Sequence, residues 1–129
     1  MVFEFGIVPV PASRPRVGRW GTYYLPTYDN FRKDMAKIVA TCPKLMIEVP
    51  MKMGVVFKMP IPKSWSKKKR EELAGKYCVS NMDLDNLEKS LYDSLNGHLI
   101  ADDKYIVEHT VRKVWTTGGG SIILDITKL

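Results

Sequence analysis

The chain has 129 residues, enough for one domain spanning residues 1–129 and built around a single core. Hydrophobic residues make up 45% and charged residues 26%, which excludes a disordered polyelectrolyte, and no apolar run reaches the roughly 20 residues that cross a bilayer. We therefore expect no membrane partner. Twenty Lys and Arg against fourteen Asp and Glu give a net charge of +6, which makes a polyanion the first partner to consider.

Alternating apolar residues predict a first strand over residues 2–8. Residues 9–19 contain three prolines and three arginines, and we expect an exposed loop without regular structure there. A helix is predicted from about residue 28 to residue 41, because Pro43 shortly afterwards prevents its continuation. Residues 47–59 alternate with a period of two, which predicts a long strand with one buried face.

Two further helices are predicted in the second half of the chain. Residues 67–73 are basic and follow a serine cap, Ser64 or Ser66. A second helix is expected from about Asp85 to Leu95, with Glu88 completing a capping box, and its leucines fall in one narrow stripe.

The last two predicted strands, residues 105–115 and 121–127, are expected to form a closing hairpin through a glycine-rich turn. Strands and helices therefore occur in mixed order along the chain. We expect an α+β fold, with a single mixed sheet of about four or five strands and helices packed on one side of it.

Charge is distributed unevenly along the chain. Residues 83–103 contain six acidic residues and one lysine, a net charge of −5, whereas the remainder carries +11. A module that only grips phosphates gains nothing from central carboxylates, because each of them repels the ligand. A nuclease needs both a basic surface and an acidic centre.

The acidic residues frame the helix expected over residues 85–95. Asp83 lies just before its start and can fold back beside Asp85, while Asp102 and Asp103 follow the helix in a loop that could return to the same end. Carboxylates about 4 Å apart repel by roughly 4 kcal/mol at an effective dielectric near 20, so their convergence calls for a cation. Oxygen ligands without a Cys/His cluster favour Mg²⁺, with Mn²⁺ able to substitute, over zinc.

Each acidic pair also has an ordinary structural interpretation. Asp-x-Asp before a helix is common as capping, and Asp-Asp is common in turns. Lys89 lies one turn after Asp85, where it would form a surface ion pair worth only about 0.3–0.5 kcal/mol. The residues alone leave both interpretations open.

A longer pattern includes these residues. Asp83-Leu84-Asp85-Asn86-Leu87-Glu88-Lys89, then Asp93-Ser94-Leu95 and then Asp102-Asp103, resembles the signature of the RusA-type Holliday junction resolvases. These are small endonucleases associated with phages and prophages. Looser similarity extends over the whole chain, including Arg14-Pro15-Arg16 and Lys113.

The resemblance implies an Mg²⁺-dependent homodimeric endodeoxyribonuclease that acts in recombination and repair, in a bacterial or phage-infected cytoplasm. It would cut branched DNA, the four-way Holliday junction, by paired symmetric incisions. The family's metal-binding acids fall on Asp83, Asp85 and Asp103, its essential lysine falls on Lys89, and Asp102 matches a second acid beside the site. Lys89 would polarise the scissile phosphate or offset its developing charge.

DNA contacts are expected from the proline-rich loop, because guanidinium groups bind phosphate in a bidentate manner. The candidate DNA-binding residues are Arg14, Arg16, Arg19 and Lys113. The aromatic residues that follow the loop either stack on unpaired bases or pack in the core; they are Trp20, Tyr23 and Tyr24.

Two other functions compete with junction resolution. One is a broader structure-selective nuclease that acts on flaps or branched phage DNA. The other is a non-catalytic DNA-binding accessory protein, in which the acidic residues only cap helices. Metal-dependent nicking distinguishes an enzyme from the accessory protein, and a panel of DNA substrates distinguishes the two kinds of nuclease.

Overall fold

The computed structural model describes residues 1–129, which group into two compact units. The first, here the sheet unit, comprises Met1–Pro9, Val49–Asn81 and Lys104–Leu129; the second, here the helical unit, comprises Val10–Glu48 and Met82–Asp103. Three α-helices, a mixed four-stranded sheet and a two-stranded sheet confirm the predicted α+β class. None of these helices combines the length and apolar character needed to span a bilayer.

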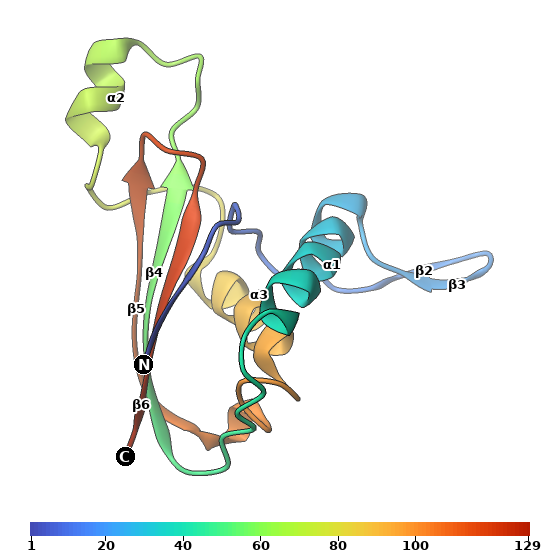
Figure 1. Ribbon diagram of the computed structural model, residues 1–129. Helices are drawn as coiled ribbons and strands as arrows, with labels where there is room; N and C mark the ends of the chain where they lie inside the picture. The colour runs from blue at the N-terminus through green and yellow to red at the C-terminus, as the bar shows by residue number, and fades with distance from the viewer. The chain divides into compact units, whose positions relative to one another are not determined.

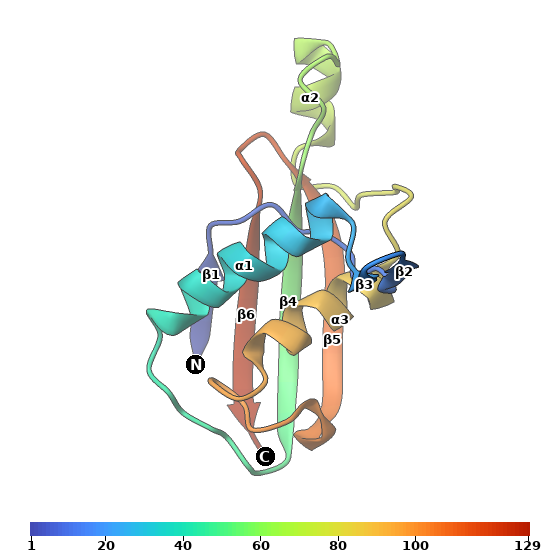
Figure 2. The same cartoon turned by 90° about the vertical axis from the view of Figure 1, so that its right-hand side faces the viewer.

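The sheet unit is built on four strands in the order β1-β6-β4-β5, which Figure 2 shows across the sheet. β1 (Val2–Phe5) and β4 (Met51–Pro60) each pair antiparallel with β6 (Ser121–Lys128), and β4 pairs parallel with β5 (Ile106–Thr116). The period of two predicted for β4 is confirmed, since its buried side chains are Met51, Met53, Val55, Phe57 and Met59. β4 starts later than expected, because Pro50 cannot donate a ladder hydrogen bond.

The expected hairpin between the last two strands is wrong, because β4 lies between β5 and β6. The chain crosses the end of β4 between Thr116 and Ser121. Gly120 permits the crossing: its φ is +90°, and a Cβ there would lie 3.2 Å from Pro60 Cδ and 3.3 Å from the Lys58 carbonyl oxygen. A strand inserted between sequence neighbours is a long-range pairing, which local patterning does not reveal.

α2 (Lys67–Leu73) belongs to the sheet unit and lies beyond one end of its strands (Figure 1). The predicted serine cap is confirmed at Ser66, whose Oγ accepts a hydrogen bond from the Lys69 amide at 3.2 Å. The chain then runs along the outer edge of β5, where the Cys78 amide donates to the Lys113 carbonyl oxygen at 3.0 Å. This segment covers part of an edge that would otherwise be open to pairing.

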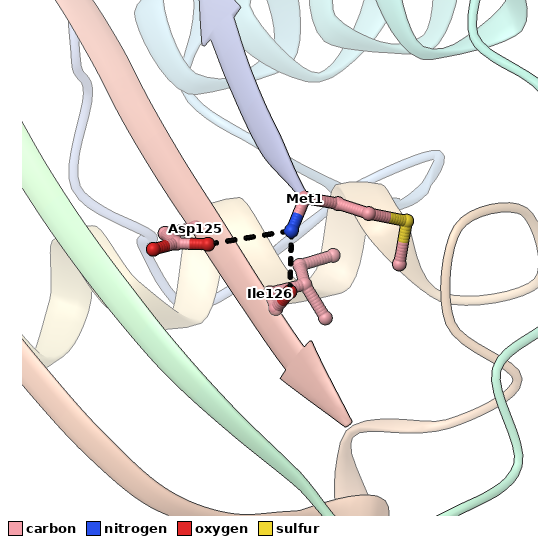
Figure 3. Close-up of polar contacts among 3 residues, drawn as sticks. All are labelled: Met1, Asp125 and Ile126. Atoms are coloured by element: carbon pink, nitrogen blue, oxygen red, sulfur yellow. Dashed lines mark hydrogen bonds and ion pairs between the residues drawn. The ribbon is translucent and has the colours of Figure 1, made fainter. Parts of the chain in front are cut away.

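β1 and β6 are joined at their ends through the backbone amine of Met1. That nitrogen donates to the carbonyl oxygen of Ile126 at 2.9 Å and lies 3.5 Å from Asp125 Oδ1 (Figure 3). Both side chains of the ion pair are more than one-third exposed, so it adds little to the stability of the β1–β6 ladder.

The helical unit contains α1 (Pro26–Ala40) and α3 (Leu84–Leu95). α1 starts two residues earlier than expected, because Pro26 occupies its first turn, where the missing amide proton costs nothing. The predicted stripe on α3 is confirmed at Leu87, Leu91 and Leu95, which are fully buried.

β2 (Arg16–Gly18) and β3 (Gly21–Tyr23) form a small antiparallel hairpin in the helical unit, which projects away from α1 and α3 (Figure 1). The expectation that residues 9–19 hold no regular structure is therefore wrong at their C-terminal end. Pro15 is the last proline, so every residue of β2 has the amide proton that ladder pairing requires.

Candidate functional site

The start of α3 carries two of the candidate metal ligands. Asp83 is its N-cap residue, with extended backbone and no side-chain capping bond, and Asp85 lies in the first turn. Oδ1 of Asp85 accepts a hydrogen bond from the Asn86 amide at 3.0 Å. The expected capping box, with Asp85 as the cap, is wrong because the helix begins at Leu84. Both carboxylates are exposed beside a helix N-terminus, where the helix dipole favours negative charge.

Asp102 and Asp103 follow the other end of α3. The chain turns tightly there, since the Gly97 amide donates to the Ile100 carbonyl oxygen at 2.7 Å and the Ile100 amide donates to that of Leu95 at 3.4 Å. Asp103 then opens the short 3₁₀ helix η1 (Asp103–Tyr105). α3 has twelve residues and therefore spans about 18 Å, which separates its first turn from the loop that carries Asp102 and Asp103.

The structure gathers no group of three or more Asp, Glu, His or Cys side chains as metal ligands. Convergence of the four aspartates on one ion therefore stays a prediction. The donor chemistry itself fits a hard divalent cation, because all four side chains are exposed carboxylates that supply only oxygen.

Lys89 lies on the exposed side of α3, and its Nζ is 3.4 Å from Oδ2 of Asp93. The expectation that Asp85 is its partner is wrong: the ion pair forms one turn further along the helix, while Asp85 faces the Asn86 amide. The Lys89 and Asp93 side chains are 66% and 40% exposed. Such an exposed pair is weak and adds little to the stability of α3.

The predicted arginines surround the β2–β3 hairpin. Arg14 precedes it, Arg16 begins β2 and Arg19 lies in the turn, and all three side chains are exposed. Trp20, beside Arg19 at the tip, is 92% exposed, with the guanidinium carbon 5.4 Å from its ring centre. Core packing is therefore excluded for Trp20, while Tyr24 is half-buried.

Lys113 belongs to β5 of the sheet unit and is half-buried. Its Nζ donates to the carbonyl oxygen of Ser80 at 3.4 Å and to its Oγ at 3.3 Å. The ammonium group of Lys113 therefore contacts the segment that runs along the edge of β5.

Comparison with known protein families identifies the family of the chain. The family described as "Endodeoxyribonuclease RusA" matches residues 6–127. The chain belongs to this family. The resemblance noted in the acidic signature is thus confirmed over nearly the whole chain, and the RusA family is one of DNA-cleaving endonucleases.

The chain is also similar to a protein of Bacillus subtilis (strain 168). It is called "Uncharacterized protein YqaN" and is 32% identical over 117 residues, which cover 84% of this chain and 82% of that protein. Its name states no activity. The similarity therefore supports a shared fold over most of both chains.

The sequence interpretation overlooked one feature of this RusA-family chain. The Arg32 guanidinium carbon lies 4.3 Å from the ring centre of Tyr24, and the rings of Tyr24 and Tyr28 meet edge to face at 5.2 Å. The signal was present, because the three residues are spaced four apart, which places them along one face of a helix.

Proposed function

We propose that the protein is an Mg²⁺-dependent endodeoxyribonuclease that resolves four-way DNA junctions. Membership of the RusA family over residues 6–127 is the observation that carries this proposal. The separation of charge supports it, since an acidic segment lies within an otherwise basic chain.

Asp83 and Asp85 at the start of α3, and Asp103 with the adjacent Asp102 after its end, would hold the metal, as the family's acidic signature implies. When bound, Mg²⁺ supplies charge neutralisation at the scissile phosphate and lowers the pKa of water. The chain's own contribution is to place two exposed carboxylates at the start of α3, where a cation can reach their oxygens.

Lys89 would bind the scissile phosphate from the exposed side of α3. Its ammonium group replaces a weak ion pair with Asp93 by a contact to an oxygen on which negative charge grows during the reaction. A group that meets charge only as it develops raises the rate more than it raises affinity.

The arginines around the β2–β3 hairpin, Arg14, Arg16 and Arg19, would contact DNA phosphates, as would Lys113. Guanidinium groups on a short, proline-preceded hairpin hold a phosphate in a fixed geometry at little entropic cost. The protein would act as a homodimer, because two symmetric incisions need two active sites related by a two-fold axis.

Cleavage of a mobile four-way junction, a flap and a plain duplex, each with Mg²⁺ and with EDTA, tests the proposal. We expect paired nicks in the junction alone and only with Mg²⁺. Equal cleavage of flap and junction would indicate the broader nuclease, and binding without cleavage would indicate the accessory protein.

A further inference from the structure

Within the helical unit, α1 and α3 border a two-lobed cleft, and the function proposed above uses only Arg14 and Lys89 of its lining. One lobe has a volume of about 420 Å³ and the other about 380 Å³, and both are lined by Tyr24, Tyr28 and Asp93. We call it the tyrosine cleft, and its defining residues are Arg14, Tyr24, Tyr28, Arg32, Lys89 and Asp93. Each lobe is within the size range of small-ligand sites.

One wall of the tyrosine cleft is held in place by backbone contacts. The Ala12 amide donates to the Asn86 carbonyl oxygen at 2.9 Å, and Ser90 Oγ donates to the Val10 carbonyl oxygen at 2.7 Å. These bonds fix residues 10–12 along α3, so the adjoining Ser13 and Arg14 line a preformed wall. Ser13 Oγ is buried and has no hydrogen-bond partner within the protein.

The side chains that line the cleft suit a ligand with a flat, partly polar ring better than they suit a simple anion. Arg32 lies over Tyr24 with its guanidinium carbon 4.3 Å from the ring centre, which forms a stacked platform of a kind on which nucleobases lie. Tyr28 is buried beside it, and burial together with the charge of Asp93 raises the pKa of its hydroxyl, which therefore keeps its proton.

Charge in the cleft favours a nucleotide over a bare phosphate. Three cations, Arg14, Arg32 and Lys89, face one carboxylate, Asp93. The cations match a phosphate, whereas the carboxylate would repel it and instead suits an N–H donor on the edge of a base, which thymine also has. A ligand with an anionic end and a donor-bearing aromatic end uses both.

We propose that the tyrosine cleft binds an unpaired nucleotide of a DNA strand, with its base on the Tyr24–Arg32 platform and its phosphate towards Arg14 and Lys89. The inference rests on the proposed function in taking DNA as the substrate and Arg14 and Lys89 as phosphate contacts. It gives the cleft the role of binding the unpaired DNA strand at a branch, where a base is no longer stacked on its neighbours.

Binding of a fluorescein-labelled oligothymidine, measured by anisotropy in EDTA and compared with a duplex of equal length, tests the proposal. Tyr24→Leu should weaken single-strand binding at least about fivefold while duplex affinity stays within about twofold, because one stacked base contributes about 1–3 kcal/mol. Tyr77→Leu is the matched control, since this exposed tyrosine lies in the other unit.

Arg32→Lys separates stacking from charge, because lysine keeps the positive charge and loses the plane. We expect weaker single-strand binding with an unchanged salt dependence. Ala36→Leu provides a variant that need not disturb folding: Ala36 is exposed on α1 and lines one lobe, so a larger side chain should block the cleft. Ala40→Leu, exposed on the same helix, is its control.

Unchanged single-strand binding in Tyr24→Leu, Arg32→Lys and Ala36→Leu would overturn the inference, and so would equal losses for single strand and duplex. Competition by deoxythymidine monophosphate as effective as that by the oligonucleotide would reassign the cleft to free nucleotides. EDTA keeps the test separate from catalysis. A protein that binds single strands through the cleft but cuts no junction supports this inference and refutes the nuclease.

Discussion

Replacing Lys89 by alanine should separate chemistry from stability. The ion pair with Asp93 spans 3.4 Å between largely exposed side chains, so its loss should cost about 0.3–0.5 kcal/mol, or about 1–2 °C in Tm. The buried leucines of α3 lie on another face, and alanine is a good helix former. If Lys89 meets charge that develops on the scissile phosphate, its removal should slow cleavage on the order of a hundredfold, about 2.7 kcal/mol.

The assay is single-turnover cleavage of a four-way junction at saturating enzyme and Mg²⁺, with thermal melting of each variant. Lys33→Ala is a matched control, because Lys33 forms the same kind of helical ion pair with Asp29, at 2.9 Å on α1. It should cleave at the wild-type rate. A Lys89→Ala rate within about threefold of wild type at equal Tm would show that Lys89 is only a surface partner of Asp93.

Three further changes test other parts of the account. Arg14→Ala combined with Arg16→Ala should weaken binding to all DNA and reduce its salt dependence, by about 0.9 released counterions per lost duplex phosphate contact. An affinity that is unchanged across a salt titration would show that these arginines do not contact DNA. Trp20→Ala should lower affinity for branched DNA and abolish most of the tryptophan quenching on binding, and an unaltered fluorescence signal would remove the hairpin tip from the interface. Gly120→Ala should lower Tm by several degrees, since a Cβ would crowd β4 at positive φ, whereas Gly119→Ala, with open space around it, should not.

Local patterns carried most of the fold prediction. The buried face of β4 and the Ser66 cap follow from residue spacing over a few positions, and the structure has both. The prediction of a β5–β6 hairpin was wrong because strand pairing in this sheet is not local. The replacement of this hairpin by two ladders with β4 depends on pairings far apart in the sequence, and the glycine-rich stretch before β6 is equally compatible with a hairpin turn.

At the site, residue types were easier to predict than partners. Asp83 lies at the helix start as expected, but Lys89 had a carboxylate one turn away in either direction, and periodicity alone could not choose Asp93 over Asp85. The contact between Arg32 and Tyr24 also follows helical spacing. However, Tyr24 precedes the first residue of α1, and helix boundaries cannot be placed exactly from a sequence.

The central claim is that α3 begins with metal-binding carboxylates of a junction nuclease, and Asp85→Asn tests it most directly. Asparagine has nearly the same shape, and its side-chain oxygen can still accept the hydrogen bond from the Asn86 amide, so the helix start should be preserved. Band shift and Mg²⁺-dependent nicking are measured on the same four-way junction. We predict that cleavage is lost while binding is kept or tightened, because a charge that repels DNA is gone. Cleavage at the full wild-type rate would contradict the account.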